Sequence, residues 1–282
     1  MLKHFTASEK EKIDSIAIGT FDGLHLGHQQ LIKRLTPDGA LFVIDRVKAN
    51  LTPGQKRSDY TTFPCFYYKI NQIKSFDCTT FVSFLKTEFP NLKNIIIGYD
   101  FKFGVQRSCD IMDLQNLFKG TITIVDEFFL DGVSVHSSKI RDLIRNGEIK
   151  RANHLIGRRY CISGTHIQGQ GLGKKELVPT INLEIKRYIL PKHGVYATIS
   201  KIGKSLFPSV TFIGIRESSD GKFSCETHII ESEIEATESM EVCFVDFVRE
   251  NKRFDSFEAL KTQILKDIDR AKMLIEKSGI HG

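Results

Sequence analysis

Short apolar runs alternate with helix-like segments throughout the first half of the chain. The runs predict β-strands at 15–18, 41–44, 79–82, 95–97 and 121–125. The segments between them can form crossover helices, and the first of these helices is predicted over 24–35. Because strands that alternate with helices usually pair in parallel, the pattern predicts a doubly wound, Rossmann-like α/β domain.

Two further helices are predicted in the middle of the chain. Ile140, Leu143 and Ile144 recur at helical spacing over 137–146. A serine can cap the start of this helix, and Gly147 suits its end. A shorter helix is expected over 149–156. The character of the sequence then changes, and we place the domains at 1–154 and 155–282.

The second half is rich in β-like segments that are separated by glycine and proline. Strands are predicted at 159–167, 194–199, 209–213, 223–230 and 241–248, which indicates an antiparallel barrel or sandwich. A final helix is expected to pack against it, starting with a capping box of Asp255 and Glu258. Its apolar face comprises Phe257, Leu260, Ile264, Ile268, Ala271 and Ile275.

Composition narrows the class of protein. The 282 residues are 41% apolar and 26% charged, which is typical of globular rather than disordered chains. No run approaches the roughly 20 apolar residues of a membrane helix, and the start of the chain is unlike a signal peptide, so we expect a cytoplasmic protein. The net charge of +6 suits a polyanionic ligand without specifying one.

Cysteine usage indicates neither a metal centre nor a disulfide framework. The six cysteines are scattered, without a Cys-x-x-Cys pair and without a histidine at ligand spacing. We expect reduced thiols that pack as small apolar side chains. They are Cys65, Cys78, Cys109, Cys161, Cys225 and Cys243.

The strongest chemical signal follows the first predicted strand. A glycine at the strand end allows close approach of backbone to phosphate, and the next helix directs its N-terminus at the anion. His25 and His28 are three residues apart and should project from the same side of that helix. Two imidazoles could neutralise the charge that develops in nucleotidyl transfer. Two solvated histidines, or a zinc pair that lacks a third ligand, are the alternatives.

This segment resembles the signature of the HxGH nucleotidyltransferases. The resemblance implies that His25 and His28 are catalytic and that the residues before them bind ATP. Those residues are Gly19, Thr20, Phe21 and Asp22. The signature is shared by enzymes with several acceptors, so alone it indicates only a superfamily.

A second stretch is similar to a more specific motif. Residues 98–104 resemble the Gly-x-Asp-Phe-Arg-Phe-Gly stretch of the bifunctional bacterial riboflavin kinase/FMN adenylyltransferases, also called FAD synthetases. The resemblance implies that Asp100, Phe101 and Phe103 bind the flavin at the carboxyl edge of the sheet. From the residues alone, an aromatic loop that packs on the sheet is the alternative.

The helix predicted over 137–146 begins like the phosphate-binding helix of the same family. His136 takes the place of a family serine, and Lys139 takes that of an arginine, which loses the bidentate fork. The resemblance implies ATP binding by Ser137, Ser138, Lys139 and Arg141. A capped surface helix is the alternative.

The second half continues the resemblance in the same order. The glycine-rich loop, Gly169, Gly171, Gly173 and Lys174, resembles the ATP-binding loop of the riboflavin kinases. Thr180 and Asn182 match a Pro-Thr-x-Asn motif, which implies binding of Mg²⁺ with the ATP phosphates. Glu226 matches the family base that accepts the proton of the riboflavin 5′-hydroxyl.

Three stretches depart from the family pattern. Leu177 and Val178 replace the usual Gly-Phe, the segment 212–218 lacks the usual Asn and Pro-Thr, and residues 44–46 lack a His-Pro continuation. The last departure means that those acceptor-site contacts cannot be transferred from the family.

The whole pattern implies an enzyme that converts riboflavin to FMN and FMN to FAD with pyrophosphate release. We expect ATP as co-substrate, Mg²⁺ as cofactor, FMN and FAD as substrate or product, and no nucleic-acid or membrane partner. A monomer or weak homo-oligomer is predicted. One alternative is an HxGH nucleotidyltransferase for another phosphorylated acceptor, and the other is a flavin-binding regulatory protein with a decayed kinase domain.

Overall fold

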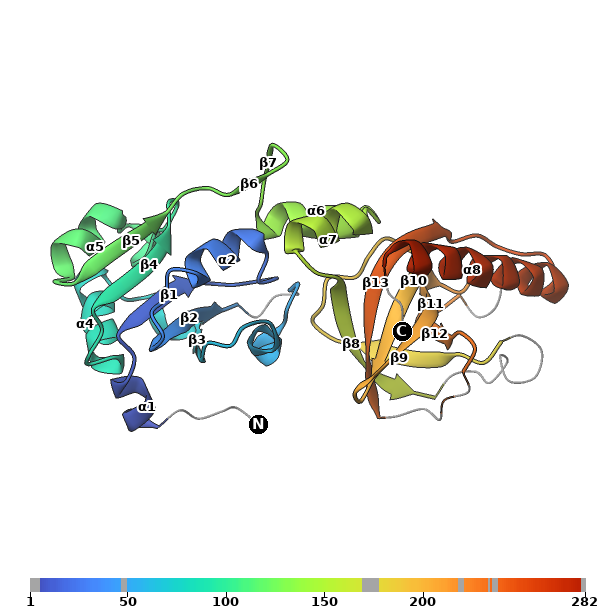
Figure 1. Cartoon of the computed structure of the whole chain (residues 1–282), viewed down its shortest axis with the longest axis horizontal. Helices are drawn as coiled ribbons and strands as arrows, with labels where there is room; N and C mark the ends of the chain where they lie inside the picture. The colour runs from blue at the N-terminus through green and yellow to red at the C-terminus, as the bar shows by residue number, and fades with distance from the viewer. Residues whose placement is uncertain are drawn as a thin grey trace. The chain divides into compact units, whose positions relative to one another are not determined.

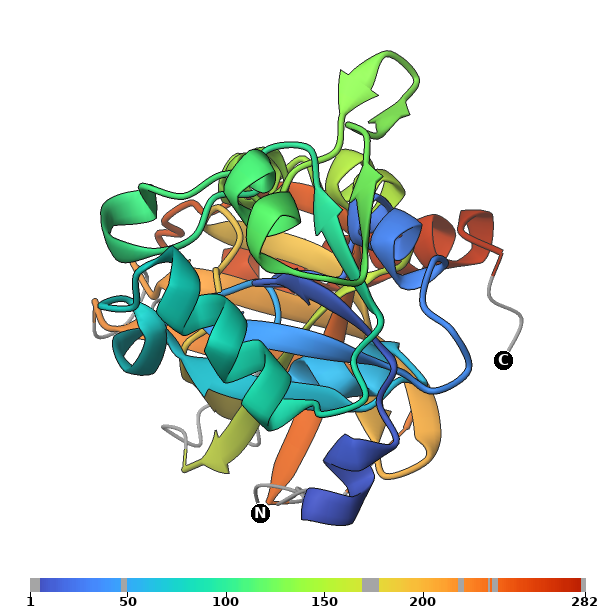
Figure 2. The same cartoon turned by 90° about the vertical axis from the view of Figure 1, so that its left-hand side faces the viewer.

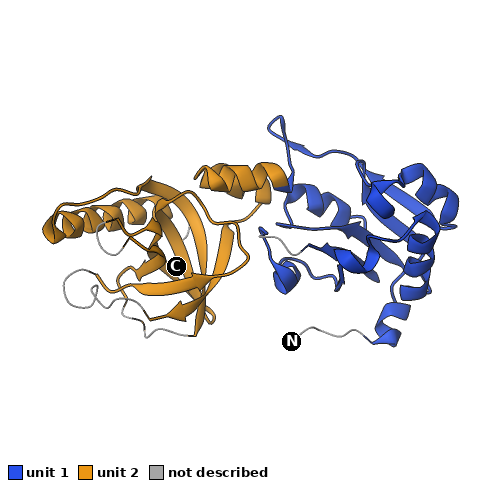
Figure 3. Cartoon of the chain, turned by 180° about the vertical axis from the view of Figure 1, so that it is seen from behind, with its two compact units in different colours: residues 1–137 blue, residues 138–282 orange. Residues whose placement is uncertain are grey.

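The computed structural model describes residues 6–46, 50–168, 178–217, 221–232, 234 and 238–279. The chain forms two compact units, 1–137 and 138–282 (Figure 3). Within the described residues, no helix is both long and apolar enough to cross a membrane.

The first unit is a five-stranded parallel sheet with helices on both faces (Figures 1 and 2). Its strand order is β3-β2-β1-β4-β5. The chain therefore adds β2 and β3 on one side of β1 and then β4 and β5 on the other side. The strands are β1 (Ser15–Gly19), β2 (Gly39–Asp45), β3 (Cys65–Lys69), β4 (Asn94–Gly98) and β5 (Thr121–Val125). The predicted doubly wound domain is confirmed.

The helices of this unit bury apolar stripes against the sheet. One face is covered by α3 (Ile70–Ile73), α4 (Cys78–Glu88) and α5 (Ile111–Leu117), and the other by α2 (Leu26–Ile32). The remaining elements are α1 (Ala7–Glu11), the 3₁₀ segments η1 (Gly54–Tyr60) and η2 (Val105–Arg107), and the short hairpin of β6 (Phe129–Leu130) and β7 (Val133–Ser134).

One strand prediction in this unit is wrong. Residues 79–82 lie in α4, although two threonines and a valine favour a strand. Asp77 caps the helix by accepting a hydrogen bond from the Thr80 N–H at 2.7 Å, and Phe81 and Leu85 bury one helical face. The sequence prediction also omits one strand of the sheet, β3, which pairs in parallel with β2.

The second unit contains a closed antiparallel barrel, as predicted, with strand order β10-β11-β12-β9-β8-β13. Its strands are β8 (Tyr160–Ile167), β9 (Ile181–Ile185), β10 (Gly194–Ile202), β11 (Ser205–Ile215), β12 (Phe223–Ile229) and β13 (Ser239–Glu250). Strand β9 was not anticipated. The long α8 (Phe257–Lys277) packs on the outside of β10, β11 and β13, and its cap is Ser256, which corrects the expected capping box.

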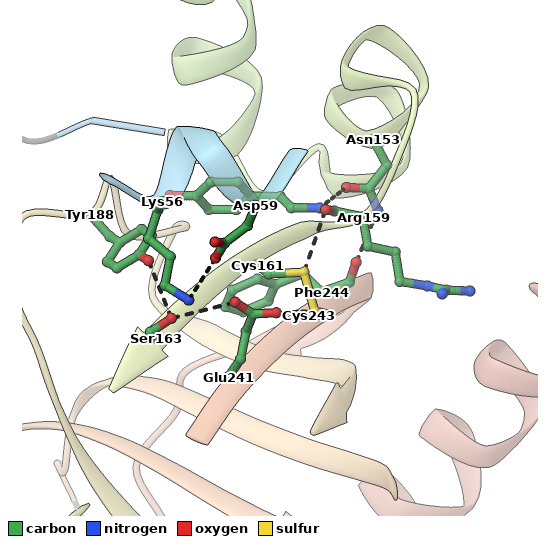
Figure 4. Close-up of a disulfide and its surroundings, with 11 residues drawn as sticks. Lys56, Asp59, Asn153, Arg159, Cys161, Ser163, Tyr188, Glu241, Cys243 and Phe244 are labelled. Atoms are coloured by element: carbon green, nitrogen blue, oxygen red, sulfur yellow. Dashed lines mark hydrogen bonds and ion pairs between the residues drawn. A yellow bond between two sulfur atoms is a disulfide. The ribbon is translucent and has the colours of Figure 1, made fainter. Parts of the chain in front are cut away.

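Helices α6 (Ser137–Arg145) and α7 (Ile149–Ile156) precede the barrel. Asn153 of α7 joins the first and last barrel strands. Its amide donates to the Phe244 carbonyl at 2.9 Å, and its carbonyl accepts from the Tyr160 N–H at 2.7 Å (Figure 4). Both predicted helices are present. The two hydrogen bonds of Asn153 attach α7 to the barrel.

Four of the six cysteines do not fit the expectation of reduced thiols. Cys161 and Cys243 face each other across β8 and β13 and form a disulfide (Figure 4), and Cys78 and Cys109 form another. Strand pairing brings together Cys161 and Cys243, which are 82 positions apart, so spacing could not reveal the pair. Cys65 and Cys225 are buried thiols, as predicted.

The barrel interior contains a chain of buried hydroxyls. Thr198 contacts the hydroxyls of Ser209 and Thr211 at 2.8 and 2.9 Å, and Thr211 contacts Thr227 at 3.0 Å. All four residues are fully buried. Each hydroxyl satisfies its neighbour, which is the condition for burying polar groups without large cost.

We expect Thr198→Val to destabilise the barrel although it preserves shape. The valine leaves two buried hydroxyls each without one partner, at a cost of about 1–2 kcal/mol. Urea unfolding of the intact chain, followed by circular dichroism, measures this as a lower midpoint. The control is Thr165→Val on the exposed part of β8, and equal midpoints for the two variants would contradict the role of the hydroxyl chain.

Candidate functional sites

The sheet topology brings separate loops together at one edge. The strand order reverses at β1 and β4, and in doubly wound sheets ligands bind beyond the carboxyl ends of the strands at such a point. The loop after β1 carries the predicted ATP-binding residues, and the loop after β4 begins with Tyr99 and Asp100. The two predicted halves of the first site therefore follow neighbouring strands.

The two histidines form a stacked pair at the start of α2. His25 is the N-cap, and its Nδ1 accepts a hydrogen bond from the His28 N–H at 3.3 Å. The ring centroids lie 3.7 Å apart, with the planes inclined by 20°. His25 is buried, so its ring orientation is held by packing as well as by the cap. The expected pairing of the imidazoles is present.

Gly27 is required by the close packing around this pair. A Cβ on Gly27 would lie 2.9 Å from the Val135 carbonyl oxygen and 3.2 Å from the His25 ring. Contacts below 3.0 Å to backbone force atoms to move, so only glycine fits between the helix and the segment before α6. This explains the glycine of the His-x-Gly-His motif in structural terms.

The buried side chains of Asp22 and Phe21 support the backbone of the loop that follows β1. Asp22 is buried, and its Oδ1 accepts a hydrogen bond from the Thr52 N–H at 3.0 Å, while the Thr52 hydroxyl accepts from the Gly23 N–H at 2.8 Å. Phe21 is fully buried and has a left-handed φ of 47°. Both side chains therefore hold the backbone of the loop, and Gly19 and Thr20 lie beside them with partial exposure.

The predicted flavin-binding residues differ in their surroundings. Phe101 and Phe103 stack with ring centroids 5.6 Å apart, and Phe103 also packs on Phe81 in the core. Asp100 is exposed. The Phe103 ring therefore supports the loop, and the more accessible groups at this edge are Asp100 and the partly buried Phe101.

The predicted phosphate-binding helix begins at the unit boundary. Ser137 is the last residue of the first unit, and its hydroxyl donates to the Asp22 carbonyl at 2.8 Å. Ser138, Lys139 and Arg141 follow on α6 in the second unit, and Ser138 and Lys139 are exposed.

The barrel presents a second group of polar side chains. Asn182 of β9 and Glu226 of β12 are directly paired across the strands. The Ser224 hydroxyl lies 2.8 Å from Glu226 Oε1 and 3.4 Å from Asn182 Oδ1. Thr180 precedes β9 and is partly buried. The predicted glycine-rich loop, Gly169 to Lys174, lies outside the described residues, as does Leu177.

Arg216 is a member of this group that sequence reasoning missed. Its Nη1 lies 3.2 Å from Glu226 Oε1, and both side chains are largely buried. In the sequence, residues 212–218 are distinguished only by the motif that they lack. Arg216 directly follows β11, which pairs with the strand that carries Glu226, and its long side chain reaches the carboxylate. Burial raises the pKa of the neighbouring Cys225 thiol to about 12, which makes it an unreactive neighbour of the carboxylate.

The chain combines an α/β unit, which has paired histidines after the first strand of its sheet, with a barrel in which a carboxylate is paired with an amide across two strands. The riboflavin kinase family model matches residues 156–275, and the FAD synthetase model matches residues 7–40. A bifunctional riboflavin kinase/FMN adenylyltransferase of Buchnera aphidicola subsp. Schizaphis graminum is 30% identical over 297 residues, with 93% of this chain and 95% of the relative covered. The chain belongs to the bifunctional riboflavin kinase/FMN adenylyltransferase family.

Further relatives also match most of the chain. The protein of the same name from Pseudomonas fluorescens is 29% identical, with 93% of both chains covered, and that from Escherichia coli K12 is 27% identical, with 89% of this chain and 90% of the relative covered. A Streptococcus pneumoniae crystal structure titled as a macrolide-efflux protein superposes with a TM-score of 0.82 at 23% identity, covering 92% of this chain and 94% of the other. This last similarity concerns the fold alone.

We expect Gly27→Ala to disturb the histidine pair. Alanine usually favours a helix over glycine by about 1 kcal/mol, but here the added Cβ must displace either the Val135 backbone or the His25 ring. The variant should therefore be less stable than the parent, and the His25 and His28 ring resonances should shift in NMR spectra. A stabilised variant with unchanged ring resonances would contradict the packing argument.

Proposed function

We propose that this chain makes FMN from riboflavin and FAD from FMN, each with one ATP. Membership of the bifunctional family supports both steps, and matching relatives cover both units. The observation that carries the first domain's role is the stacked His25–His28 pair at the carboxyl edge of the sheet. The observation that carries the barrel's role is the pairing of Asn182 with Glu226.

In adenylyl transfer, an FMN phosphate oxygen attacks the α-phosphorus of ATP, and the bond to pyrophosphate breaks. His25 Nδ1 is occupied as an acceptor, so the neutral ring carries its proton on Nε2 and donates from there. His25 and His28 together stabilise the charge that develops on the α-phosphate oxygens. No covalent intermediate with the protein is needed.

The other members of this site hold the substrates in line. ATP is bound by Gly19, Thr20, Phe21, Asp22, Ser137, Ser138, Lys139 and Arg141. Phe21 and Asp22 act through the loop backbone that they support, since their side chains are buried. The flavin is held at Asp100, Phe101 and Phe103, where Phe103 acts as the support beneath Phe101.

In the kinase reaction, the riboflavin 5′-hydroxyl attacks the γ-phosphorus of ATP, and ADP leaves. Glu226 accepts the hydroxyl proton, and its contacts with Arg216 and Ser224 fix the carboxylate in position. The loop containing Gly169, Gly171, Gly173 and Lys174 binds the ATP phosphates. Phosphoryl transfer of this kind depends mainly on positioning and charge neutralisation.

The oxygen donors beside Glu226 fit Mg²⁺. The Asn182 side chain lies next to the Ser224 hydroxyl, and Thr180 is two residues away, so the donors are hard oxygen ligands. Thr180 and Asn182 would hold the ion. When bound, Mg²⁺ neutralises charge on the ATP phosphates.

The organisation of the chain follows from the same proposal. We assign 1–154 to the adenylyltransferase and 155–282 to the kinase, which is supported by the start of the kinase family match at residue 156. Riboflavin, FMN and ATP are the partners, without nucleic acid or membrane. We further propose a cytoplasmic monomer or weak homo-oligomer.

We expect His28→Ala to lower FAD formation from FMN and ATP by about 10²–10³-fold, the loss typical of a missing transition-state donor. FMN formation from riboflavin by the same preparation should be unchanged, because that reaction belongs to the barrel. Separation of the flavins by chromatography measures both. FAD formation at the parental rate would contradict the assigned role.

We expect Glu226→Gln to show the opposite pattern. The amide preserves shape and keeps an acceptor for Ser224 but is not a base, so FMN formation should fall by about 10²–10⁴-fold while FAD formation from added FMN continues. The parent chain serves as the reference in the same assay. A parent that forms FAD but not FMN would favour the decayed-kinase alternative, and one that forms neither would refute the proposed function.

A further inference from the structure

A buried threonine after β2 is bound to the loop that follows β1, and neither proposed reaction assigns it a role. Thr52 donates its N–H to Asp22 Oδ1 at 3.0 Å, and its hydroxyl accepts a hydrogen bond from the Gly23 N–H at 2.8 Å. Thr52 is only 3% exposed. Because β1 and β2 are neighbouring parallel strands (Figure 1), the two bonds connect loops at the same edge of the sheet. Thr52 therefore holds two consecutive residues of the loop at once.

The loop needs such support because its backbone is strained. Phe21 and Leu24 have left-handed φ values of 47° and 38°, which bulky L side chains adopt only at a cost in free energy. Gly23, which lies between them, has a φ of 90°. Conformations of this kind persist only where the surrounding structure fixes them. Phe21 and Leu24 are buried by packing, and the Thr52 hydroxyl fixes the Gly23 N–H.

The residues around this threonine are themselves held in place. The Leu51 side chain is fully buried and lies against Gly23, where an added Cβ would come within 2.8 Å of Leu51 Cδ1. The buried Arg57 guanidinium donates to the Gly54 carbonyl at 2.9 Å and pairs with Asp45, the last residue of β2, at 3.3 Å. These contacts attach η1 to the end of β2, so the threonine has little freedom to move away from the loop.

The loop connects this threonine to the proposed nucleotide site through its backbone. It leads directly into His25, the N-cap of α2, and the Asp22 carbonyl accepts a hydrogen bond from the Ser137 hydroxyl at 2.8 Å. Asp22 therefore contacts Thr52 through its side chain and Ser137 through its backbone. Thr52 is too deeply buried to contact a substrate. An effect of its hydroxyl on ATP must therefore act through the position of the loop.

We propose that Thr52 is a positioning residue for adenylyl transfer, whose hydroxyl holds the ATP-binding loop in the geometry that receives the nucleotide. The inference rests on the proposed function. Residues 44–46 lack the family's His-Pro continuation, so the role of the stretch after β2 follows from the contacts of this chain alone. If only a fraction of the molecules holds the loop correctly, the apparent affinity for ATP falls by that fraction, whereas the complex reacts as before once it has formed.

The test compares the intact parent with Thr52→Val and Thr52→Ser in FAD formation from FMN and ATP. Valine preserves the shape but removes the acceptor of the Gly23 N–H. The Michaelis constant for ATP should therefore rise about tenfold, as for one buried hydrogen bond, while kcat stays within about twofold of the parent. Serine keeps the hydroxyl and should retain the parental constant. Hydrogen exchange of the Gly23 amide should become faster in the valine variant and not in the serine variant.

Thr36→Val is the matched control. The Thr36 and Ser15 hydroxyls lie 2.7 Å apart near the first residues of β1 and β2, at the opposite edge of the same sheet. This variant loses a comparable hydrogen bond, so it should unfold at a lower temperature than the parent while its Michaelis constant for ATP is unchanged. FMN formation should be unchanged in every variant, because that reaction is assigned to the barrel.

A parental Michaelis constant for ATP in a folded Thr52→Val variant would overturn the inference. An equal rise in Thr36→Val, or a loss confined to kcat, would overturn it as well. If circular dichroism shows that the valine variant does not fold, Thr52→Ala removes the same hydroxyl without placing a methyl group against the amide and is judged by the same criteria. A parent that forms no FAD would contradict the proposed function instead, so the two failures are distinguishable.

Discussion

The hydrogen bond from the His28 N–H to His25 Nδ1 is the interaction on which the proposed nucleotide site depends. It ends the irregular loop after β1, begins α2 and fixes the tautomer of a buried imidazole. Position 27 beside it requires a glycine, because the Val135 carbonyl and the His25 ring approach the helix closely. The start of α2, the orientation of the two rings and the packing of the loop after β1 therefore depend on one another.

The two units position the side chains of their candidate sites in different ways. In the α/β unit, the strand order brings loops from β1 and β4 to one edge, so the site is built from residues that follow strands. In the barrel, Asn182 and Glu226 lie within neighbouring strands and are opposed by register. Two residues held within paired strands have little freedom to move, which suits the proposed role of Glu226 as a base for a substrate hydroxyl.

Most of the architecture could be predicted from local signals, because the central strands are apolar and the helices periodic. The prediction failed where tertiary packing and capping outweighed propensity, as at residues 79–82, where Asp77 starts a helix. The pairing of the barrel strands was also not predicted. It opposes Cys161 to Cys243 and brings Arg216 to Glu226, and neither relation appears in the spacing along the chain.

The central claim is that the paired imidazoles bind the ATP phosphates during adenylyl transfer. The most direct measurement is a crystal structure of the intact protein with FMN and an ATP analogue that resists cleavage between the α- and β-phosphates. The account predicts the His25 and His28 rings within hydrogen-bond distance of the α- or β-phosphate oxygens. A triphosphate bound at this edge with both rings directed away from it would contradict the account.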